Sequence, residues 1–272
     1  MSAVAWLTVK RGDAPLLVSL PHAGTELGAL EPRLVSPWLA RKDTDWWIDQ
    51  LYDFASGLGA TVVRTAMSRT VIDVNRDPSG ASLYPGQATT DLCSTTTFDG
   101  EALYKAGQAP GAAEIAERRS TWFDPYHAAL REEIARLRAK HRVIVAYDCH
   151  SIRSVIPRLF EGELPMFNLG TNGGLSADPA LTREVAALLR VSGQSSVVNG
   201  RFKGGWITRA YGDPASGAHA LQMELACRTY LREPIGAVGP ADWPPPYNAV
   251  HAAPTREILR RVLEAIVAWA RR

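Results

Sequence analysis

The sequence predicts an α/β fold in which a mostly parallel mixed sheet is flanked by helices. Short apolar runs of strand length alternate along the chain with longer segments of helical periodicity, as in βαβ units. The run at residues 143–147 is apolar without alternation, which indicates a strand covered on both faces. Because no internal repeat or change of composition interrupts the pattern, we expect residues 1–272 to form a single α/β domain.

The N-terminal part predicts a strand, a helix and a second strand. Residues 16–20 are apolar, and this strand must end at Pro21, because proline cannot donate to a sheet ladder. Asp43 is a suitable N-cap for a helix that runs to about residue 58 and has apolar residues at helical spacing. Residues 60–64 form the next strand.

The middle of the chain predicts a further strand, a long loop and a long helix. Residues 70–74 have strand character and break into a polar turn, and residues 81–111 show little periodicity. A loop of that length inside a compact domain is usually functional. The segment 111–141 is helical, with an interruption near Asp124 and Pro125, and residues 143–151 form the strand that follows.

The C-terminal part continues the alternation. After a loop that extends through Gly174, Asp178 as N-cap and Pro179 open a helix that ends near residue 190. Residues 218–225 alternate like a strand, and residues 255–270 form a closing amphipathic helix.

Composition excludes several classes of function. The net charge of +2, with scattered basic residues, argues against a nucleic-acid or membrane surface. Three cysteines without CxxC spacing indicate a reducing compartment. The N-terminus lacks the basic region and apolar core of a signal peptide, and no apolar run approaches the ~18 residues of a membrane span, so we expect a cytoplasmic protein.

Ionisable side chains stand at the ends of the predicted strands. His22 follows the first strand, Asp148 and His150 end the central one, and Glu224 lies in the last. In open α/β sheets, ligands bind beyond the carboxyl ends of the strands. Two histidines and one carboxylate, such as Asp45, are a common catalytic zinc set, and a separate glutamate would deprotonate the zinc-bound water.

Structural explanations compete with these roles. A loop histidine and a turn-capping aspartate would account for His150 and Asp148, and a buried salt bridge would account for Glu224. No GxSxG, GxxxxGK[ST] or GxGxxG spacing supports a nucleophilic serine or a phosphate loop. The other histidines lack clustered partners, and we expect structural or exposed roles for His127, His141, His251 and, unless it lines a pocket, His219.

Arginines form a second group of candidate binding residues, because several stand in loops beside strand ends. Arginine binds carboxylates bidentately, so a group of them near one pocket would suit a small, doubly acidic substrate. Ordinary surface arginines are the alternative. The residues concerned are Arg69, Arg76, Arg153, Arg201 and Arg209, together with Lys203.

Eight motifs, in order over nearly the whole chain, resemble those of the N-formylglutamate deformylase (N-formylglutamate amidohydrolase) family. They are Pro21-His22-Ala23-Gly24-Thr25, Asp43-Thr44-Asp45-Trp46, Ser68-Arg69-Thr70-Val71-Ile72-Asp73-Val74-Asn75-Arg76, Leu83-Tyr84-Pro85-Gly86-Gln87, Asp148-Cys149-His150-Ser151-Ile152-Arg153-Ser154, Asn168-Leu169-Gly170-Thr171, Asn199-Gly200-Arg201-Phe202-Lys203-Gly204-Gly205 and Gln222-Met223-Glu224-Leu225. The resemblance implies a fold similar to the zinc-dependent exopeptidases. It also implies hydrolysis of N-formyl-L-glutamate to L-glutamate and formate, a step of bacterial histidine degradation.

The resemblance further implies roles for individual residues. His22 and His150 match the family's metal-binding histidines, and Glu224 matches the residue expected to act as general base. The His-x-x-Glu spacing of zinc carboxypeptidases is broken here, because Thr25 stands at the glutamate position. The third ligand is therefore expected among three carboxylates, in order of preference Asp45, Asp43 and Glu26. Zn²⁺ is the expected metal, with another divalent ion as the alternative.

Binding of a small acidic substrate is expected from one further set of side chains: Asn75, Arg76, Arg153, Arg201, Lys203 and Arg209. Asp148 is expected to orient His150 from outside the metal's own ligands. Two other functions stay open, a deacylase for another N-acyl or N-formimidoyl acidic amino acid and a non-catalytic protein that binds an acidic amino acid. Metal content and sensitivity to a chelator distinguish the metallohydrolase from the binding protein.

Overall fold

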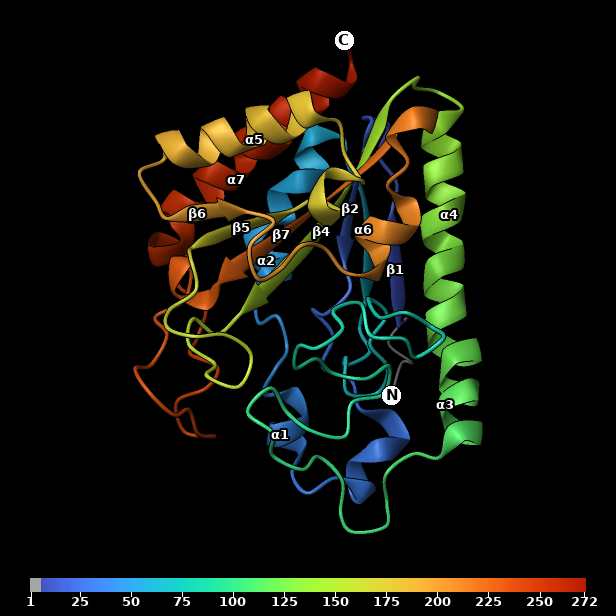
Figure 1. Cartoon of the computed structure of the whole chain (residues 1–272), viewed down its shortest axis with the longest axis vertical. Coiled ribbons are helices and arrows are strands. Elements are labelled where there is room, and N and C mark those ends of the chain that lie inside the picture. Colours follow the sequence, from blue (N-terminus) through green and yellow to red (C-terminus); the bar gives the residue numbers. More distant parts are fainter. Residues whose placement is uncertain (1–5) are drawn as a thin grey trace.

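A computed structural model describes residues 6–272 of the chain, and these contain a seven-stranded sheet (Figure 1). The strand order is β1-β3-β2-β4-β7-β5-β6. β3, β2, β4 and β7 run parallel, whereas β1 pairs antiparallel with β3, and β5 pairs antiparallel with β7 and parallel with β6. The strands are β1 (Leu7–Lys10), β2 (Leu16–Leu20), β3 (Thr61–Thr65), β4 (Ile144–Ile152), β5 (Phe167–Gly170), β6 (Ser196–Val198) and β7 (Ala218–Ala226).

Helices cover both faces of this sheet, so the predicted α/β class with a mostly parallel mixed sheet is confirmed. One core packs α2, α5 and α7 against β2, β4, β5 and β7, and a second core packs α4 and α6 against the opposite face (Figure 1). The helices are α1 (Pro37–Arg41), α2 (Ile48–Leu51), α3 (Ala112–Arg118), α4 (Asp124–Arg138), α5 (Pro179–Val191), α6 (Trp206–Tyr211) and α7 (Ala249–Ala270). Among the helices of residues 6–272, none combines the length and hydrophobicity that crossing a membrane requires.

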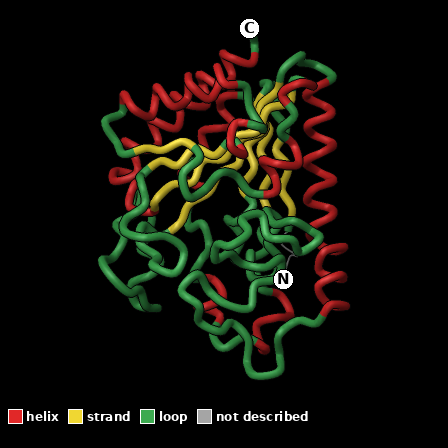
Figure 2. Tube along the Cα trace, viewed as in Figure 1, coloured by secondary structure: helices red, strands yellow, loops and turns green. Residues whose placement is uncertain are grey.

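Shorter turns join these elements. A π-helical turn, η3 (Arg119–Phe123), separates α3 from α4 and accounts for the predicted interruption of the long helix. The 3-10 turns are η1 (Gly28–Arg33), η2 (Asp53–Leu58), η4 (Asn172–Gly174), η5 (Pro214–Ser216) and η6 (Cys227–Thr229). Beyond one end of the sheet, loops take the place of long helices (Figure 2). They include the aperiodic stretch predicted for residues 81–111, which contains no helix or strand.

The alternation of side chains along β4 places polar residues on one face of the sheet. Tyr147 and Cys149 lie in the core beneath α5 and α7, whereas Ala146 lies in the core beneath α4. Because successive residues of a strand point to opposite faces, Asp148 and His150 continue the row of Ala146. Cys149 therefore faces away from them, as expected. α6 lies on this face and has only six residues, which is too short to cover the carboxyl end of β4. Loops therefore surround Asp148 and His150 there.

The two central strands meet at a change of direction in the chain. From β2 the chain passes to β3 on one side, and it later crosses to β4 on the other side of β2. Ser19 of β2 lies opposite Asp148 of β4. In open α/β sheets the crevice at such a switch point is the usual ligand site. The chain is thus arranged so that His22 and His150 emerge at this crevice.

Two of the predicted elements are wrong. Residues 70–74 form turns and not a strand, although Val71, Ile72 and Val74 are buried there. The single helix expected from Asp43 to residue 58 is broken into α2 and η2, and α2 begins only after Trp47, whose φ is 61°. Asp43 is not the N-cap of α2: Trp47 stands at that position and makes no side-chain cap hydrogen bond.

Other elements lacked a strong local pattern. β5 and α6 fall in stretches expected to be loops, and β1 and β6 were not expected. β5 and β6 have four and three residues, which are too few for a clear period. The helix expected to open at Asp178 is α5, and its N-cap accepts a hydrogen bond from the backbone N–H of Ala180. Residues 1–5, on which the expectation about a leader peptide rests, lie outside the described part of the chain.

Candidate active site

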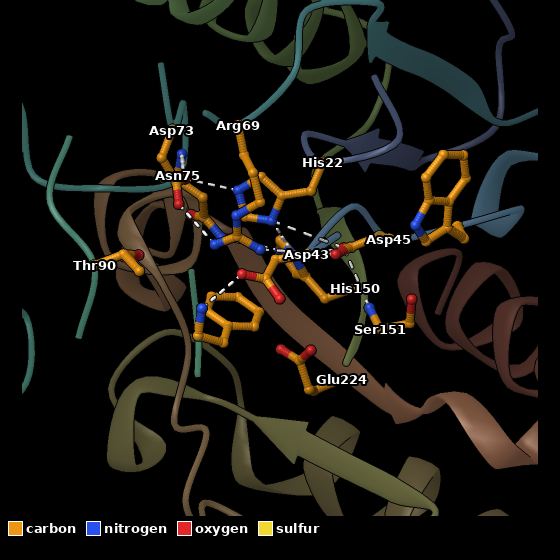
Figure 3. A network of polar contacts seen from close by, with 12 residues as sticks. His22, Asp43, Asp45, Arg69, Asp73, Asn75, Thr90, His150, Ser151 and Glu224 are labelled. Atoms are coloured by element: carbon orange, nitrogen blue, oxygen red, sulfur yellow. Dashed lines mark hydrogen bonds and ion pairs between the residues drawn. The ribbon is translucent and has the colours of Figure 1, made fainter. Parts of the chain in front are cut away.

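Three buried side chains converge at the crevice between β2 and β4. The Nδ1 atoms of His22 and His150 lie 3.1 Å apart. Oδ2 of Asp45 lies 3.2 Å from Nδ1 of His150 and 3.8 Å from Nδ1 of His22. Figure 3 shows the three side chains pointing toward one another from separate elements. All three are at most 3% exposed, so water competes little with any ligand that they share.

Backbone contacts hold Asp45 between the two strands. Asp45 lies in the turn between α1 and α2, and its N–H donates to the carbonyl oxygen of His22 at 3.1 Å. Its Oδ2 accepts from the N–H of Ser151, the residue after His150, at 3.2 Å. Asp45 is therefore attached to the chain beside both histidines, which explains why it reaches them from the turn where the predicted helix is interrupted.

Each histidine also contacts a further carboxylate through Nε2, the ring nitrogen that faces away from the shared centre. Nε2 of His22 lies 2.6 Å from Oδ1 of Asp73, and Nε2 of His150 lies 2.7 Å from Oδ2 of Asp148. We assign both Nε2 atoms as donors, because a carboxylate only accepts. This tautomer leaves a lone pair on each Nδ1, directed at the shared centre. Carboxylates in this position orient metal-binding histidines, which is the role expected of Asp148.

The donor set fits a divalent metal ion. Two lone pairs that face each other at 3.1 Å repel unless a cation lies between them. Oδ1 of Asp45 is buried and makes no hydrogen bond within residues 6–272. The separations are also close to the about 3.3 Å expected between ligands of a tetrahedral zinc with bonds of about 2.0–2.1 Å. The group His22, Asp45 and His150 could therefore hold a metal ion.

The electrostatics of the group favour a cation. Burial lowers the pKa of His150, but Asp148 and Asp45 outweigh it and raise that pKa well above its usual value. Burial and the nearby Arg69 lower the pKa of His22, which keeps this imidazole neutral. The same negative surroundings that stabilise a proton on His150 stabilise a divalent cation in its place.

Glu224 lies beside this group on the neighbouring strand. It stands opposite His150 in the β4–β7 register and is 6% exposed. Its Oε2 accepts from Nε2 of Gln222 at 3.1 Å, and its carboxylate points toward the histidines (Figure 3). Burial raises the pKa of Glu224 to about 7. Within residues 6–272 it forms no salt bridge, so the structural explanation for a glutamate in this strand does not apply.

A cavity opens above the metal group and is lined by both basic and apolar side chains. Its wall includes Glu224, and of the residues expected to bind substrate it includes Asn75, Arg76 and Arg201. Both ends of the Asn75 amide are engaged, because Nδ2 donates to Asp148 and Oδ1 accepts from the N–H of Ile207. The two arginines therefore remain the better candidates for contact with an acidic ligand.

The other three expected substrate residues lie outside this wall. Arg153 forms ion pairs with Asp43 at 3.2 Å and Asp99 at 2.7 Å, which turn it away from the cavity. Arg209 donates to the carbonyl oxygen of Leu83 at 3.0 Å. The side chain of Lys203 is exposed. The position of these residues next to strand ends did not determine which way each side chain turns.

The two alternative third ligands also lie elsewhere. Asp43 accepts from the N–H of Phe98 at 2.6 Å and pairs with Arg153, and burial raises its pKa. Glu26 is exposed, at an isolated bridge with Met67. Of the three carboxylates considered from the sequence, Asp45 is the one that joins the histidines.

Asp73 and Gln222 had no assigned role in the sequence interpretation, and Arg69 was named among the loop arginines but not among the expected substrate residues. Arg69 is 7% exposed, and its Nη2 donates to Oδ2 of Asp73 at 2.8 Å. Its guanidinium lies 4.8 Å from the Phe98 ring and also lines the cavity. Asp73 was the recognisable signal, since a carboxylate within the apolar stretch 71–74 needs partners if it is buried. Gln222 could have been found by alternation, because it shares the face of Glu224 in β7.

The remaining histidines do not join the site. His127 is buried, with Nδ1 2.7 Å from the hydroxyl of Tyr211 and Nε2 2.8 Å from the carbonyl oxygen of Val74, so its structural role is confirmed. His219 accepts from the N–H of Asp178 at 3.1 Å and lines a separate hollow near the start of β7.

Asp73→Asn is expected to weaken metal binding about 10- to 100-fold, as loss of a carboxylate behind a histidine ligand typically does. The amide no longer stabilises the Nε2–H of His22 as strongly and can itself donate, which favours the wrong tautomer. A competition titration against a chromogenic chelator measures the affinity. Asp148→Asn is the matched change behind His150. Wild-type affinity in Asp73→Asn would show that Asp73 serves only its pair with Arg69.

Comparisons with known proteins relate the whole chain to one family. The family described as N-formylglutamate amidohydrolase matches residues 14–231. The N-formylglutamate deformylase of Pseudomonas aeruginosa is 46% identical over 267 residues, covering 97% of each chain. That of Pseudomonas putida is 46% identical over 265 residues, covering 97% of this chain and 96% of its own. The crystal structure of N-formylglutamate amidohydrolase from Ralstonia eutropha JMP134 aligns with a TM-score of 0.79 at 23% identity, over 98% of this chain and 99% of that one, and so shares the fold.

The matched range includes every residue of the metal group and Glu224. Both the extent of the match and the identity over nearly the full length lead to one conclusion. The chain belongs to the N-formylglutamate amidohydrolase family.

Proposed function

We propose that this chain is a metal-dependent amidohydrolase that converts N-formyl-L-glutamate to L-glutamate and formate in histidine degradation. The proposed metal is Zn²⁺, held by His22, Asp45 and His150 in a single metallohydrolase domain. The observation that supports this most directly is the convergence of three buried ligand atoms beside a buried glutamate that forms no salt bridge within residues 6–272. The names of the Pseudomonas relatives supply the substrate.

In this proposal Glu224 moves the proton. The chemistry that zinc supplies in such sites is Lewis acidity and a lowered pKa of water. Glu224 takes a proton from the attacking water as the water oxygen bonds to the formyl carbon. It then delivers that proton to the amide nitrogen as the C–N bond breaks. The raised pKa of about 7 suits both transfers near neutral pH.

Arg69 and Arg76 supply positive charge to the bound substrate. Arg69 is fixed by Asp73 and the Phe98 ring, so its guanidinium is oriented before negative charge develops on the formyl oxygen. Arg76 donates from Nε and Nη2 to Thr90, at 3.0 and 2.8 Å, and lines the cavity. An acidic substrate would find these charges in a partly desolvated pocket, where they act more strongly than at the surface.

A substrate panel is the decisive test. We expect N-formyl-L-glutamate to exceed N-formyl-L-aspartate and N-formimidoyl-L-glutamate in kcat/KM by more than about 10-fold, since binding sites of this kind discriminate a methylene or a hydrogen-bonding group at least that strongly. About one equivalent of zinc should accompany the purified protein, and a chelator should abolish turnover. Higher kcat/KM with another substrate would identify the rival deacylase. Tight binding of acidic amino acids without turnover or metal would instead indicate a binding protein.

A further inference from the structure

One wall of the cavity is a segment without an apolar anchor. Residues 82–88 contain no helix or strand, and Tyr84 and Ala88 line the cavity. None of the seven belongs to the hydrophobic cores of the described chain. The position of this segment must therefore depend on polar contacts.

The hydrogen bonds from this segment to the rest of the described chain all lead to residues 201–209, which comprise a loop and the first turn of α6. The Tyr84 hydroxyl donates to the carbonyl oxygen of Gly204 at 2.6 Å and accepts from the N–H of Lys203 at 3.2 Å. Arg209 donates to the carbonyl oxygen of Leu83 at 3.0 Å. Arg201 donates from Nη2 to the carbonyl oxygen of Ala88 at 2.9 Å. Segment 82–88 is thus fastened to residues 201–209, and Tyr84 supplies two of the four hydrogen bonds.

The Tyr84 ring also contacts two guanidinium groups. It lies 5.7 Å from Cζ of Arg201 and 5.3 Å from Cζ of Arg209. Cation–π contacts at this distance are favourable and restrict the guanidinium plane. Arg201 is restricted further by the Phe202 ring at 5.2 Å and by its Nε–H, which donates to the carbonyl oxygen of Leu159 at 2.8 Å. Arg201, which lines the cavity, is consequently held in one orientation.

In the described part of the chain, no salt bridge neutralises the charge of Arg201. Within residues 6–272 it makes no ion pair with a carboxylate, and its Nη1 makes no hydrogen bond. Arg76 differs, because its Nε lies 3.6 Å from Asp73, which in turn contacts the proposed metal ligand His22. Arg201 bonds only to loop carbonyl groups. Arg76 is thus linked through Asp73 to the proposed metal ligand, whereas the hydrogen bonds of Arg201 within residues 6–272 lead to other loops of the cavity wall.

We propose that Arg201 binds the side-chain carboxylate of the substrate and that Tyr84 is the positioning residue that holds Arg201 there. The α-carboxylate, one carbon from the scissile nitrogen, then falls to Arg76. A carboxylate at Arg201 uses the free Nη1–H together with the remaining Nη2–H as a bidentate pair. This inference rests on the proposed hydrolysis of an acidic formyl amino acid. The contact between segment 82–88 and residues 201–209 would then make the enzyme prefer substrates with a distal negative charge.

Tyr84→Leu is expected to lower kcat/KM for N-formyl-L-glutamate by about 10- to 100-fold through KM, since it removes a hydroxyl bridge and a cation–π contact. N-Formyl-L-glutamine differs only by an amide in place of the distal carboxylate. In the same variant, kcat/KM for this amide should fall less than about 3-fold, because the contacts of a neutral group do not depend on the charge of Arg201. Tyr84→Phe keeps the ring, so kcat/KM should fall about 2- to 10-fold, and only for N-formyl-L-glutamate. If turnover of the amide is too slow to follow, its inhibition constant replaces its KM.

Arg201→Gln provides the comparison, because it should remove the preference for acid over amide to at least the extent seen with Tyr84→Leu. Equal losses for acid and amide in the Tyr84 variants, or an unchanged preference, would overturn the inference while leaving the proposed function intact. Wild-type protein with one equivalent of metal and no turnover of N-formyl-L-glutamate would overturn both. Metal content and the melting temperature of each variant show whether a loss arises from misfolding.

Discussion

Replacing Glu224 with glutamine is expected to lower kcat by about 10²- to 10⁴-fold, the usual contribution of a general base. Glutamine has nearly the same shape and can still contact Gln222, but it cannot accept the proton of the attacking water. Metal should remain bound, because Glu224 is not in the group His22, Asp45 and His150. Single-turnover kinetics at saturating substrate, with metal content measured on the same sample, test this.

The pH profile gives the same residue a second test. A base acts only when deprotonated, so kcat/KM should fall with decreasing pH below the pKa of Glu224. Burial raises that pKa to about 7, and a bound cation lowers it, so the acid limb is expected below pH 7. The limb should be absent from the residual activity of Glu224→Gln.

Glu233→Gln is the matched control for this change. Glu233 is a partly buried carboxylate whose pKa is also raised by burial, but its Oε1 accepts from the N–H of Ser154 at 2.7 Å and it does not line the cavity. It should keep the wild-type kcat and acid limb. Near-normal kcat in Glu224→Gln would remove Glu224 from the role of base and direct attention to the carboxylates behind the histidines.

Asp45→Asn is expected to weaken metal binding by more than about 100-fold, because even carboxylates that only support a ligand contribute about 10–100-fold. The neutral amide can offer an oxygen, but it removes the negative charge that balances a divalent cation at this buried site. The apo protein should show no measurable turnover until metal is added in large excess. Equilibrium dialysis followed by elemental analysis measures the affinity.

Asp43→Asn separates a ligand role from a general loss of negative charge. Asp43 lies two residues from Asp45, but it contacts Phe98 and Arg153. An asparagine there still accepts from the N–H of Phe98, so metal affinity should be retained. The melting temperature should fall, because a buried ion pair is weakened. Loss of metal from Asp43→Asn and not from Asp45→Asn would reverse the assignment of the third ligand.

Sequence alone could predict those parts of the molecule that depend on local pattern. The apolar runs at residues 16–20, 143–151 and 218–225 correspond to β2, β4 and β7. Because a strand alternates with a period of two, the same pattern placed Asp148 and His150 on one face and Cys149 on the other. Their position at strand ends, together with the motifs of the family, pointed to His22, His150 and Glu224.

Tertiary contacts overrode local propensity where segments distant in sequence meet. Residues 70–74 look like a strand but form turns, because Asp73 bonds to Leu92, His22 and Arg69 and not to a sheet ladder. The helix expected from Asp43 is interrupted because its first carboxylates bond to Phe98 and to Ser151.

The direction of each charged side chain could not be predicted from the sequence. Arg153 and Arg201 look alike as loop arginines next to strand ends, yet Arg153 meets Asp43 and Asp99 while Arg201 meets only carbonyl groups and aromatic rings. A buried charge takes the partner that loop packing brings within reach, and that partner can be more than a hundred residues away. The sequence by itself thus determined the four parallel strands β2, β3, β4 and β7, the polar residues at their carboxyl ends and the residue types for the chemistry. Only the folded chain decided which carboxylate joins the histidines and which arginines face the cavity, because those choices depend on contacts between segments distant in sequence.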